Sequence, residues 1–319
     1  MFICFSCGII TYMKWMIVAP DMLDKNLSLV ENFLDSQNAE YVEMFLSQDS
    51  KIESLNRDIQ KAHAVTHCII VDSQKVAAGS DYALILGYLL GKNTMTFIYT
   101  GGQYEKHYEK IQTEGQTFFR SFDNIQNLIK YITNNYALYE VEERQFASLQ
   151  RLLTLGIPFT SDMFAQYIAK DKTEICELFL NAGMITTAFN GEGVPMLCIA
   201  ARNECFEKVK WLLDNGADIN AVSKDRGYTP VMDAVWRKNY EITEYLIEAG
   251  ADLSIISSDG QPILVLAVGN GDARIVELLL RNGANADIKD SMGMSAREYA
   301  NLFKKNGIDK LMLKYPPKN

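Results

Sequence analysis

The sequence predicts a two-domain chain of 319 residues, in which an α/β domain with a parallel sheet precedes an all-α solenoid of helical repeats. The solenoid is predicted by a phrase that starts with Gly and ends with Ala, and that recurs at Gly193, Gly227, Gly260 and Gly293. The α/β domain is predicted by apolar runs that alternate with helical patterns in the first half of the chain. A composition of 48% hydrophobic and 22% charged residues is ordinary for globular domains and supplies apolar residues for two cores.

The first residues of the chain, 1–12, form an apolar extension, and Met13 is an alternative start. Met1–Ala19 is apolar enough to suggest a signal peptide or a membrane anchor. However, it has no basic start, Lys14 interrupts it, and Pro20 follows in place of a small-residue cleavage site. The stretch before Lys14 is also shorter than the ~20 residues of a membrane span. We therefore expect a cytoplasmic protein without a membrane partner.

The charge of the chain limits the classes of partner that it can bind, and its cysteine content indicates its cellular compartment. The net charge of -9 and the pI near 5.0 argue against nucleic acid or an acidic membrane surface as the partner. Six scattered cysteines fit a reducing compartment. Cys4 and Cys7 have a C-x-x-C spacing, and His63 and His67 are four apart, but the sequence supplies neither pair with further ligands. We expect no metal site.

Residues 13–136 alternate between strand-like and helix-like stretches. The predicted strands are Lys14–Ala19, Tyr41–Leu46, Cys68–Asp72, Thr94–Tyr99 and Gln116–Phe119. The predicted helices are Asn26–Ser36, Ser50–His63, Asp81–Leu90 and a last one from Phe122 to about Tyr136. This alternation predicts a parallel sheet between two helical layers, of the flavodoxin-like type. The stretch 137–159, with a helix at Glu140–Leu155, is predicted to link this domain to the repeats.

A second phrase follows the first in the same frame of about 33 residues. It reads Trp211–Asp218, Tyr245–Asp252 and Leu278–Asn285, each with paired apolar residues before Gly-Ala. Two phrases that recur in one frame, with a Thr-Pro helix start, resemble the ankyrin repeat of paired helices. The resemblance implies about five repeats over residues 160–319, of which both terminal ones are degenerate caps. Paired residues such as Leu246 can be buried only by the next repeat, so we expect one stack.

The first phrase also predicts how the first helix of each repeat begins. Thr229 and Ser295 are expected to accept a hydrogen bond from the first free N–H groups of a helix. Pro230 occupies the position where a helix tolerates a missing N–H. In two repeats the proline lies one place earlier, at Pro195 and Pro262, so those helices are expected to begin slightly differently.

One phrase of the first domain carries a chemical signal. It runs from Val71-Asp72 through Gly79-Ser80-Asp81-Tyr82-Ala83-Leu84-Ile85-Leu86-Gly87-Tyr88 to Gly91-Lys92. The phrase is similar to one in the nucleoside 2-deoxyribosyltransferase family, which has an Asp after the third strand and then Asp-Ser-Gly-Thr-x-x-Glu-x-Gly-Tyr-Ala. TIR domains share this architecture. Either resemblance implies cleavage of the N-glycosidic bond of a nucleoside or of NAD.

The resemblance is incomplete at the nucleophile. A gap-free alignment on Gly87 puts Ile85 where the transferases have their nucleophilic Glu, whereas Asp72 and Ser80 match the family. An Ile side chain has no carboxylate with which to attack the sugar or to stabilise its cation. We therefore expect a degenerate site, in which Asp72 and Asp81 remain as the catalytic candidates.

Acidic residues follow the strands at the carboxyl edge of the predicted sheet, where open α/β sheets bind ligands. Asp21 comes after the first strand, Asp72 after the third, and Ser80 and Asp81 begin the next helix. We expect these four residues to bind a nucleoside or NAD-like ligand, and we expect no cofactor. The alternative for each of them is a helix cap or a turn residue.

Seven residues of the repeats are candidates for binding a protein partner. In the repeat frame they occupy exposed places on the inner helices or lie near a hairpin tip: Arg202, Asn203, Trp236, Arg237 and Asn270, and Arg226 and Tyr228. An exposed Trp beside Arg is typical of a binding hot spot. The alternative is that Trp236 packs against a neighbouring repeat or against the first domain.

Two functions follow from these patterns. The first is a protein–protein interaction protein that also carries a degenerate nucleoside-binding domain. The alternative is an N-glycoside-cleaving enzyme, deoxyribosyltransferase-like or TIR-like, that its repeats recruit or regulate. Ile85 at the nucleophile position favours the first function.

Overall fold

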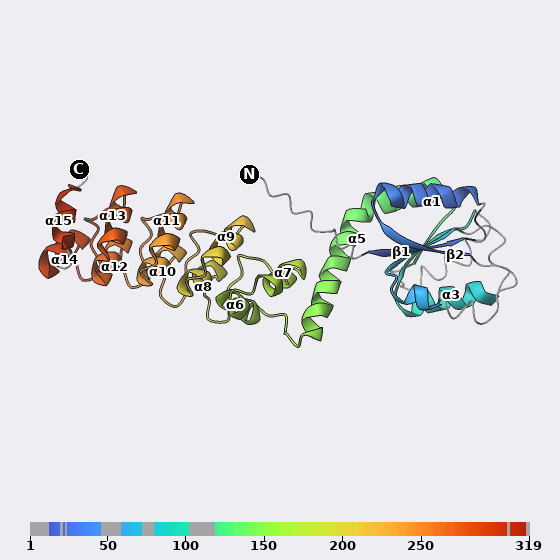
Figure 1. Ribbon diagram of the computed structural model, residues 1–319, viewed down its shortest axis with the longest axis horizontal. Helices are drawn as coiled ribbons and strands as arrows, with labels where there is room; N and C mark the ends of the chain where they lie inside the picture. The colour runs from blue at the N-terminus through green and yellow to red at the C-terminus, as the bar shows by residue number, and fades with distance from the viewer. Residues whose placement is uncertain are drawn as a thin grey trace. The chain divides into compact units, whose positions relative to one another are not determined.

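In the computed structural model of the protein, the chain forms two compact units, Met1–Ala147 and Ser148–Asn319 (Figure 1). Each unit is described separately below. The structure describes residues 13–19, 22, 24–45, 59–71, 80–101, 119–304 and 307–316.

The first unit contains a parallel sheet of five strands in the order β2-β1-β3-β4-β5 among the residues that the structure describes. The strands are β1 (Lys14–Ala19), β2 (Glu40–Phe45), β3 (His67–Val71), β4 (Met95–Tyr99) and β5 (Phe119–Phe122). This strand order is that of flavodoxin-like sheets, so the predicted architecture is confirmed. The central strands β1 and β3 read as continuous apolar runs because both of their faces are buried.

Helices cover both faces of the sheet (Figure 1). On one face, α1 (Lys25–Ser36) and the start of α5 (Ile125–Thr154) pack on alternate strand residues such as Trp15 and Ile69. On the other face, α3 (Ser80–Gly91) and the helical stretch 59–63 pack on the intervening residues, such as Met16 and Ile70. The predicted three layers are therefore present.

Two sequence predictions at the end of this unit are wrong in detail. The predicted strand Gln116–Phe119 overlaps the observed β5, Phe119–Phe122, only at Phe119. At the edge of the sheet β5 carries the polar residues Arg120 and Ser121, so an apolar run does not mark it. The two helices predicted around residues 122–136 and 140–155 are one helix, α5, because no Gly or Pro between them interrupts it.

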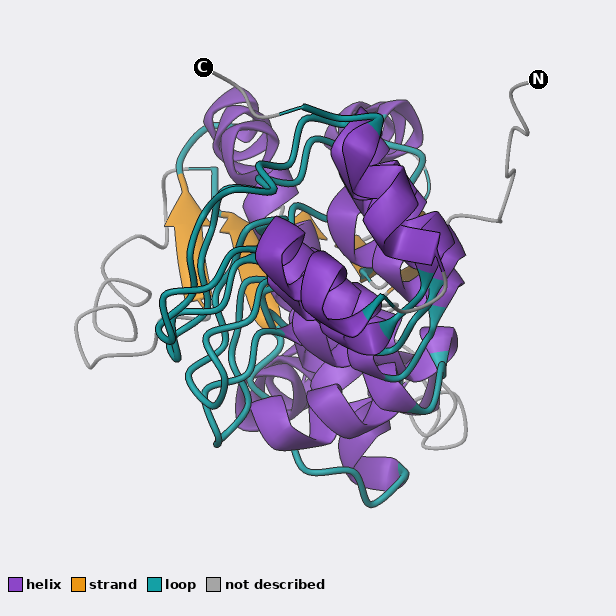
Figure 2. Cartoon of the chain, turned by 90° about the vertical axis from the view of Figure 1, so that its left-hand side faces the viewer, coloured by secondary structure: helices purple, strands orange, loops and turns teal. Residues whose placement is uncertain are grey.

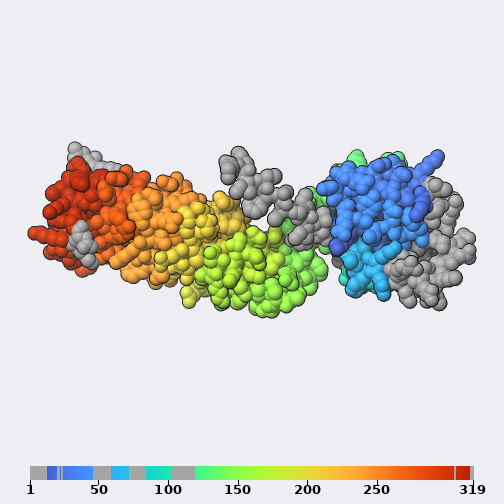
Figure 3. Space-filling model, in the orientation of Figure 1, coloured from blue at the N-terminus to red at the C-terminus, as the bar shows by residue number. Residues whose placement is uncertain are grey.

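The second unit is a row of helix pairs that follow one another in chain order (Figure 1). The colours of the space-filling view follow the same order along this unit (Figure 3). The pairs in the described residues are α6 (Ser161–Ala169) with α7 (Thr173–Asn181), α8 (Met196–Arg202) with α9 (Phe206–Asp214), α10 (Pro230–Trp236) with α11 (Tyr240–Glu248), α12 (Ile263–Asn270) with α13 (Ala273–Arg281), and α14 (Ala296–Phe303) with α15 (Ile308–Leu313). The predicted array of helical repeats is confirmed. The described helices include none that is long and apolar enough to cross a membrane.

The first helices of the repeats all begin in the same register, three residues after the glycine of the first phrase. The prediction that Pro195 and Pro262 shift the helix start is therefore wrong. These two prolines are N-caps with extended backbone, and Thr229 and Ser295 occupy the same position in their repeats. Extended φ and ψ angles suit proline and N-cap residues alike, so the register is kept.

Of the two predicted side-chain caps, only Ser295 forms. The Ser295 hydroxyl accepts from the Glu298 N–H, and the Glu298 carboxylate accepts from the Ser295 N–H at 2.7 Å, which completes a capping box. The Thr229 hydroxyl caps nothing, because it is buried and has no hydrogen-bond partner. Its helix begins with Pro230, whose missing N–H is one that would have no partner within the helix in any case.

Leucines of the second phrase form the core between neighbouring repeats. Leu212, Leu246 and Leu279 are fully buried in one apolar cluster that extends through the unit. Short antiparallel bridges, such as the one between Ile256 and Pro262, shape the hairpin tips that precede the first helices. Each first phrase glycine has a positive φ, and at Gly227 an added Cβ would lie 2.1 Å from the Ser258 nitrogen of the next tip. The tips of neighbouring repeats therefore approach each other backbone to backbone.

Candidate functional site

The hairpin tips and the first helices of the last three repeats line two adjacent hollows, which together we call the inner groove. The loops of the repeats lie on one side of the paired helices (Figure 2). The Trp236 hollow, about 260 Å³, is lined by Asp225, Arg226, Tyr228, Trp236, Ser258 and Asp259. The Tyr299 hollow, about 330 Å³, is lined by Asp259, Gln261, Val265, Gly269, Asp290, Ser291, Met292, Tyr299 and Phe303. Asp259 belongs to both hollows, so the groove is continuous from one repeat to the next.

Trp236 gives the first hollow its apolar wall. It is the last residue of α10 and is 47% exposed, although the six residues before it in this helix are buried. The Tyr228 ring meets it edge to face, with centroids 6.5 Å apart. The Arg226 guanidinium lies 5.9 Å from the Trp236 ring centroid and 6.0 Å from that of Tyr228. No carboxylate of the described residues is within ion-pair distance of Arg226, so its charge faces the hollow.

Arg202 does not lie exposed on the inner helix as predicted, because it holds two repeats together. Its guanidinium donates to both carboxylate oxygens of Asp225, at 2.7 and 3.0 Å, and to Asp233 at 2.9 Å. Its side chain is only 18% exposed. The carboxylates raise the Arg202 pKa, although burial opposes this effect, and the Arg202 hydrogen bonds hold the Asp225 pKa below its usual range. Arg202 therefore links two repeats through ion pairs and is not free to bind a partner.

Asp233 lies beneath the inner groove and is completely buried. Burial raises the pKa of its carboxyl to about 6, even though the Arg202 charge beside it acts in the opposite direction. One carboxylate oxygen accepts from Arg202, whereas the other has no hydrogen-bond partner. The sequence offers a signal for this pair, since an Arg and an Asp interrupt helices that are otherwise apolar on this face.

The other predicted interaction residues differ in exposure. Asn203 and Arg237 are exposed, and Arg237 pairs with Glu204 at 3.1 Å. Asn270 is half-buried, and its amide donates to the Val235 carbonyl at 2.8 Å. Tyr228 is buried apart from its contribution to the Trp236 hollow, and its hydroxyl donates to Gln261 at 3.2 Å. The structure therefore brings Arg226, Tyr228 and Trp236 together but ties Arg202 and Asn270 to neighbouring repeats.

Sequence reasoning missed the Tyr299 hollow, which is lined by residues of the last two repeats together. Tyr299 and Phe303 stack with ring centroids 5.8 Å apart and an interplanar angle of 9°. Phe303 is 58% exposed and Met292 is 80% exposed. The i, i+4 spacing of the two aromatic residues was a signal for this stack, since such residues lie on one helix face.

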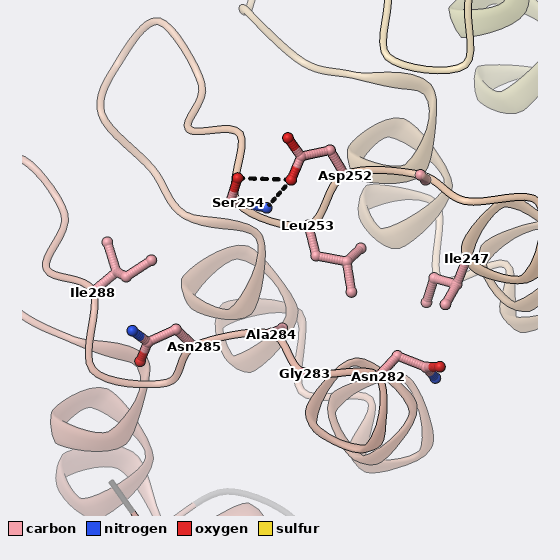
Figure 4. A pocket seen from close by; sticks show the side chains of 10 residues that line it. Ile247, Asp252, Leu253, Ser254, Asn282, Gly283, Ala284, Asn285 and Ile288 are labelled. Atoms are coloured by element: carbon pink, nitrogen blue, oxygen red, sulfur yellow. Dashed lines mark hydrogen bonds between the residues drawn. The ribbon is translucent and has the colours of Figure 1, made fainter. Parts of the chain in front are cut away.

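A third hollow, about 360 Å³, lies between the loops that follow α11 and α13 (Figure 4). Its only charged lining residue is Asp252, whose carboxylate accepts from the Ser254 N–H and hydroxyl. Ile247, Leu253 and Ile288 contribute apolar side chains around it (Figure 4). With its carboxylate engaged locally, this hollow offers less for recognition than the inner groove.

The ligand candidates of the first unit fall largely beyond the part of the chain that the structure describes. Asp21 and Asp72 lie outside the described residues. Ser80 and Asp81 form the first turn of α3, but their side chains also lie outside that description. Ile85, at the aligned nucleophile position, is buried and packs on the core between α3 and the sheet.

The two described histidines of the first unit, His63 and His67, have different surroundings. His63 contacts the Tyr88 hydroxyl at 3.0 Å, whereas His67 is buried beside the Trp15 ring. Burial lowers the pKa of His67 to about 4, so its imidazole is neutral at pH 7. Within the described residues no group of three or more His, Cys, Asp or Glu side chains is placed to hold a metal ion.

Comparison with known proteins identifies the second unit. Residues 163–257 and 231–316 match the family described as ankyrin repeats. An ankyrin repeat-containing protein of Treponema pallidum is 34% identical over 172 residues, which cover 52% of this chain and 58% of that protein. Human B-cell lymphoma 3 protein is 39% identical over 103 residues, or 32% of this chain and 23% of that protein. Its mouse homologue is 34% identical over 101 residues and is covered to 22%. The chain thus spans less than two thirds of each relative.

Proposed function

Residues 163–316 are ankyrin repeats, and we propose that they hold a protein partner along the inner groove. Stacked repeats present an extended concave surface that a single compact domain does not offer. Both hollows of the groove lie on the same tips and first helices, so one continuous segment of a partner can contact them together.

Trp236 is the observation that carries this proposal. Half of its side chain is exposed at the end of an otherwise buried helix, and the Arg226 guanidinium lies 5.9 Å from its ring centroid. Keeping a Trp in water is unfavourable by the hydrophobic effect, and Trp and Arg are enriched in the hot spots of interfaces. A partner that covers Trp236 recovers the free energy of burying it.

The test compares wild-type protein with the Trp236→Ala and Leu313→Ala variants. Leu313 is 80% exposed on α15 and does not line the inner groove, so it controls for the loss of any exposed apolar group. Partners are pulled down from a cell extract with wild type and their affinities measured. We expect Trp236→Ala to weaken binding by about 2 kcal/mol or more, about 30-fold in Kd, and Leu313→Ala to leave it unchanged. Equal affinities for all three proteins would remove Trp236 from the interface.

We further propose that the first unit binds a nucleoside or NAD-like ligand. The strand order reverses at β1 and β3, and ligands of such sheets bind at the carboxyl ends of the strands that flank the reversal. Asp21 and Asp72 follow these two strands in the sequence, which supports the proposal. Thermal shift with nucleosides and NAD tests it, because binding raises the stability of the folded state. We expect a shift for wild type and a smaller one for Asp72→Asn; no shift with any of these compounds argues against a ligand site.

We propose that this site does not exchange deoxyribose between bases. The support is Ile85, which offers no nucleophile and lies in the core. The protein is incubated with a deoxynucleoside and a second base, and separately with NAD, and free base is followed by chromatography. Rapid base exchange that a single carboxylate substitution abolishes would favour the enzymatic alternative and point to Asp72 or Asp81.

A cytoplasmic location is part of the proposal. Its support is the sequence, whose six scattered cysteines fit a reducing compartment. Localisation of a tagged protein in its own cells tests it.

A further inference from the structure

Gly269 opens the floor of the Tyr299 hollow. It lies nine residues after its phrase glycine, at the position that Trp236 occupies one repeat earlier and Leu302 one repeat later. A Cβ added to Gly269 would meet no atom within 4 Å. Glycine inside a helix is destabilising, and Gly269 lies within α12. Neither close packing nor a turn requires a glycine at this position. What it does provide is space beside Val265 at the base of the groove.

The walls of this space are aromatic and apolar. The Tyr299 and Phe303 rings are stacked, and Phe303 and Met292 expose more than half of their surface. Stacked ring faces attract a cation, and flat apolar surfaces suit the methylene stem of a long side chain.

Carboxylates stand at both sides of the same space. Asp259 accepts from the Ser257 hydroxyl, and Asp290 accepts from the Tyr299 hydroxyl at 2.8 Å. Within the described residues neither carboxylate has a Lys, Arg or His partner at ion-pair distance. Both therefore present negative charge to the hollow that no cation of the described chain pairs with. Arg226 in the neighbouring Trp236 hollow makes that end of the groove unfavourable for a second cation.

We propose that the Tyr299 hollow takes a Lys or Arg side chain from the segment of a protein partner that lies in the inner groove. The cationic head pairs with Asp259 and Asp290, and the stem packs along Phe303 and Met292 above the space that Gly269 leaves open. This inference rests on the proposed protein-binding function and adds the chemical character of the partner.

The sequence of another repeat shows how the charge of Asp290 can be removed without disturbing its turn. Asn190 occupies the position of Asp290 in an earlier repeat, and its side-chain oxygen accepts from two backbone N–H groups of its tip at 3.1 and 2.8 Å. Asp290 accepts from the corresponding groups of Met292 and Met294 at 3.0 Å. Asp290→Asn therefore keeps the turn and removes the charge. Asp218→Asn is the control, since Asp218 accepts from the Asn220 N–H in the same manner but does not line the groove.

The experiment probes the full-length protein with four pools of immobilised short peptides. The pools have the same random composition except for one central position, which is fixed as Lys, Arg, Gln or Glu. Retention is measured for wild type, the Asp259→Asn/Asp290→Asn double variant, the Asp218→Asn control, Gly269→Leu and Trp236→Ala. Gly269→Leu fills the floor without changing a charge, and its side chain is the one that the next repeat carries at Leu302.

We expect the Lys and Arg pools to retain wild type about fivefold more than the Gln pool, with the preference falling at high salt. The double variant should lose this preference, Gly269→Leu should lose most of it, and Asp218→Asn should keep it. Equal or stronger retention by the Gln or Glu pools overturns the basic-partner inference.

The Trp236→Ala variant separates the basic-partner inference from the proposal that the inner groove binds a protein. Lower retention in all pools supports the inner groove as the binding surface, and retention unchanged by Trp236→Ala contradicts it even where a basic preference remains.

Discussion

The burial of His67 ties the stability of the first unit to pH. Its ring is 2% exposed, packs 4.7 Å from the Trp15 ring and 5.4 Å from the Tyr139 ring, and has a hydrogen bond of 2.9 Å with the Thr66 hydroxyl. Burial disfavours the imidazolium form and lowers the pKa of His67 from 6.5 to about 4.

The folded unit is therefore expected to lose stability as the pH falls from 6.5 to 4. In this window the unfolded chain binds a proton at His67 and the folded chain does not, so protonation favours unfolding. The contribution of neutral His67 to the free energy of unfolding is complete above pH 6.5. About 3 kcal/mol of this free energy is lost by pH 4. Urea unfolding followed by Trp15 fluorescence, with the other two tryptophans replaced by Phe, measures this slope. His67→Leu should flatten it; an identical slope in wild type and variant would rule out His67 as its source.

At the scale of single residues the sequence predicted which face of a repeat a side chain occupies, but not which residues of other repeats it contacts. The frame placed Trp236 on the surface correctly, because the position of a residue within a repeat fixes the face it occupies. Arg202 was expected on the same surface, but its carboxylate partners Asp225 and Asp233 come from the next repeat. Contacts between repeats depend on how neighbouring helices pack, which the pattern within one repeat does not contain.

Helix caps give a prediction at the scale of the element. Ser295 forms a capping box, whereas the buried Thr229 hydroxyl at the equivalent position has no partner. Ser295→Ala should lower the free energy of unfolding by about 0.5–2 kcal/mol. Thr229→Val, which keeps the shape and removes the hydroxyl, should be neutral or stabilising. Chemical denaturation of the two variants checks this contrast, and equal losses would contradict the different roles of the two hydroxyls.

Glycines of the two phrases are expected to respond differently to the same substitution. Gly227 and Gly216 both have positive φ, of 68° and 83°, which costs an L-residue about 1–2 kcal/mol. An added Cβ at Gly216 would meet nothing within 4 Å, whereas at Gly227 it would lie 2.1 Å from the Ser258 nitrogen. Gly227→Ala should therefore destabilise the repeats more than Gly216→Ala. Melting temperatures of the two variants test the order; a larger effect at Gly216 would show that the tips do not approach as closely as described.

The elements themselves were largely predictable from the sequence, with exceptions at the edge of the sheet and in α5. Buried strands such as β3 are continuous apolar runs, and the repeat helices recur in a fixed frame. The edge strand β5 has a mixed composition, and the end of a helix is obvious only where Gly or Pro stops it. The inner groove was predicted only at Trp236 and its neighbours, because Tyr299 and Asp259 come together through the stacking of two repeats, which the pattern within one repeat does not contain.

At the scale of the whole unit, the repeats share one continuous apolar core, so we expect them to unfold cooperatively. Leu246 of α11 is fully buried in a cluster that extends from Leu152 to Met312. Leu246→Ala should lower the free energy of unfolding by about 2–5 kcal/mol, because it removes core packing and leaves a cavity. The transition should shift as a whole, since each repeat depends on its neighbours. Leu302→Ala, at a position 64% exposed, is the control and should change stability by less than about 0.5 kcal/mol. An unchanged denaturation curve for Leu246→Ala would contradict the repeat register.

The measurement that tests the binding surface most directly is photo-crosslinking from within the inner groove. A benzoylphenylalanine residue replaces Met292, which is 80% exposed in the Tyr299 hollow, or Ile185, which is 63% exposed on the loop after α7 and outside the groove. After irradiation in the cells that make the protein, we predict a discrete protein adduct from position 292 and none from position 185. Gly269→Leu or Trp236→Ala in the same chain should abolish that adduct. Equal adducts from both positions, or an adduct that survives both groove substitutions, would contradict the inner groove as the site where the ankyrin repeats hold a partner.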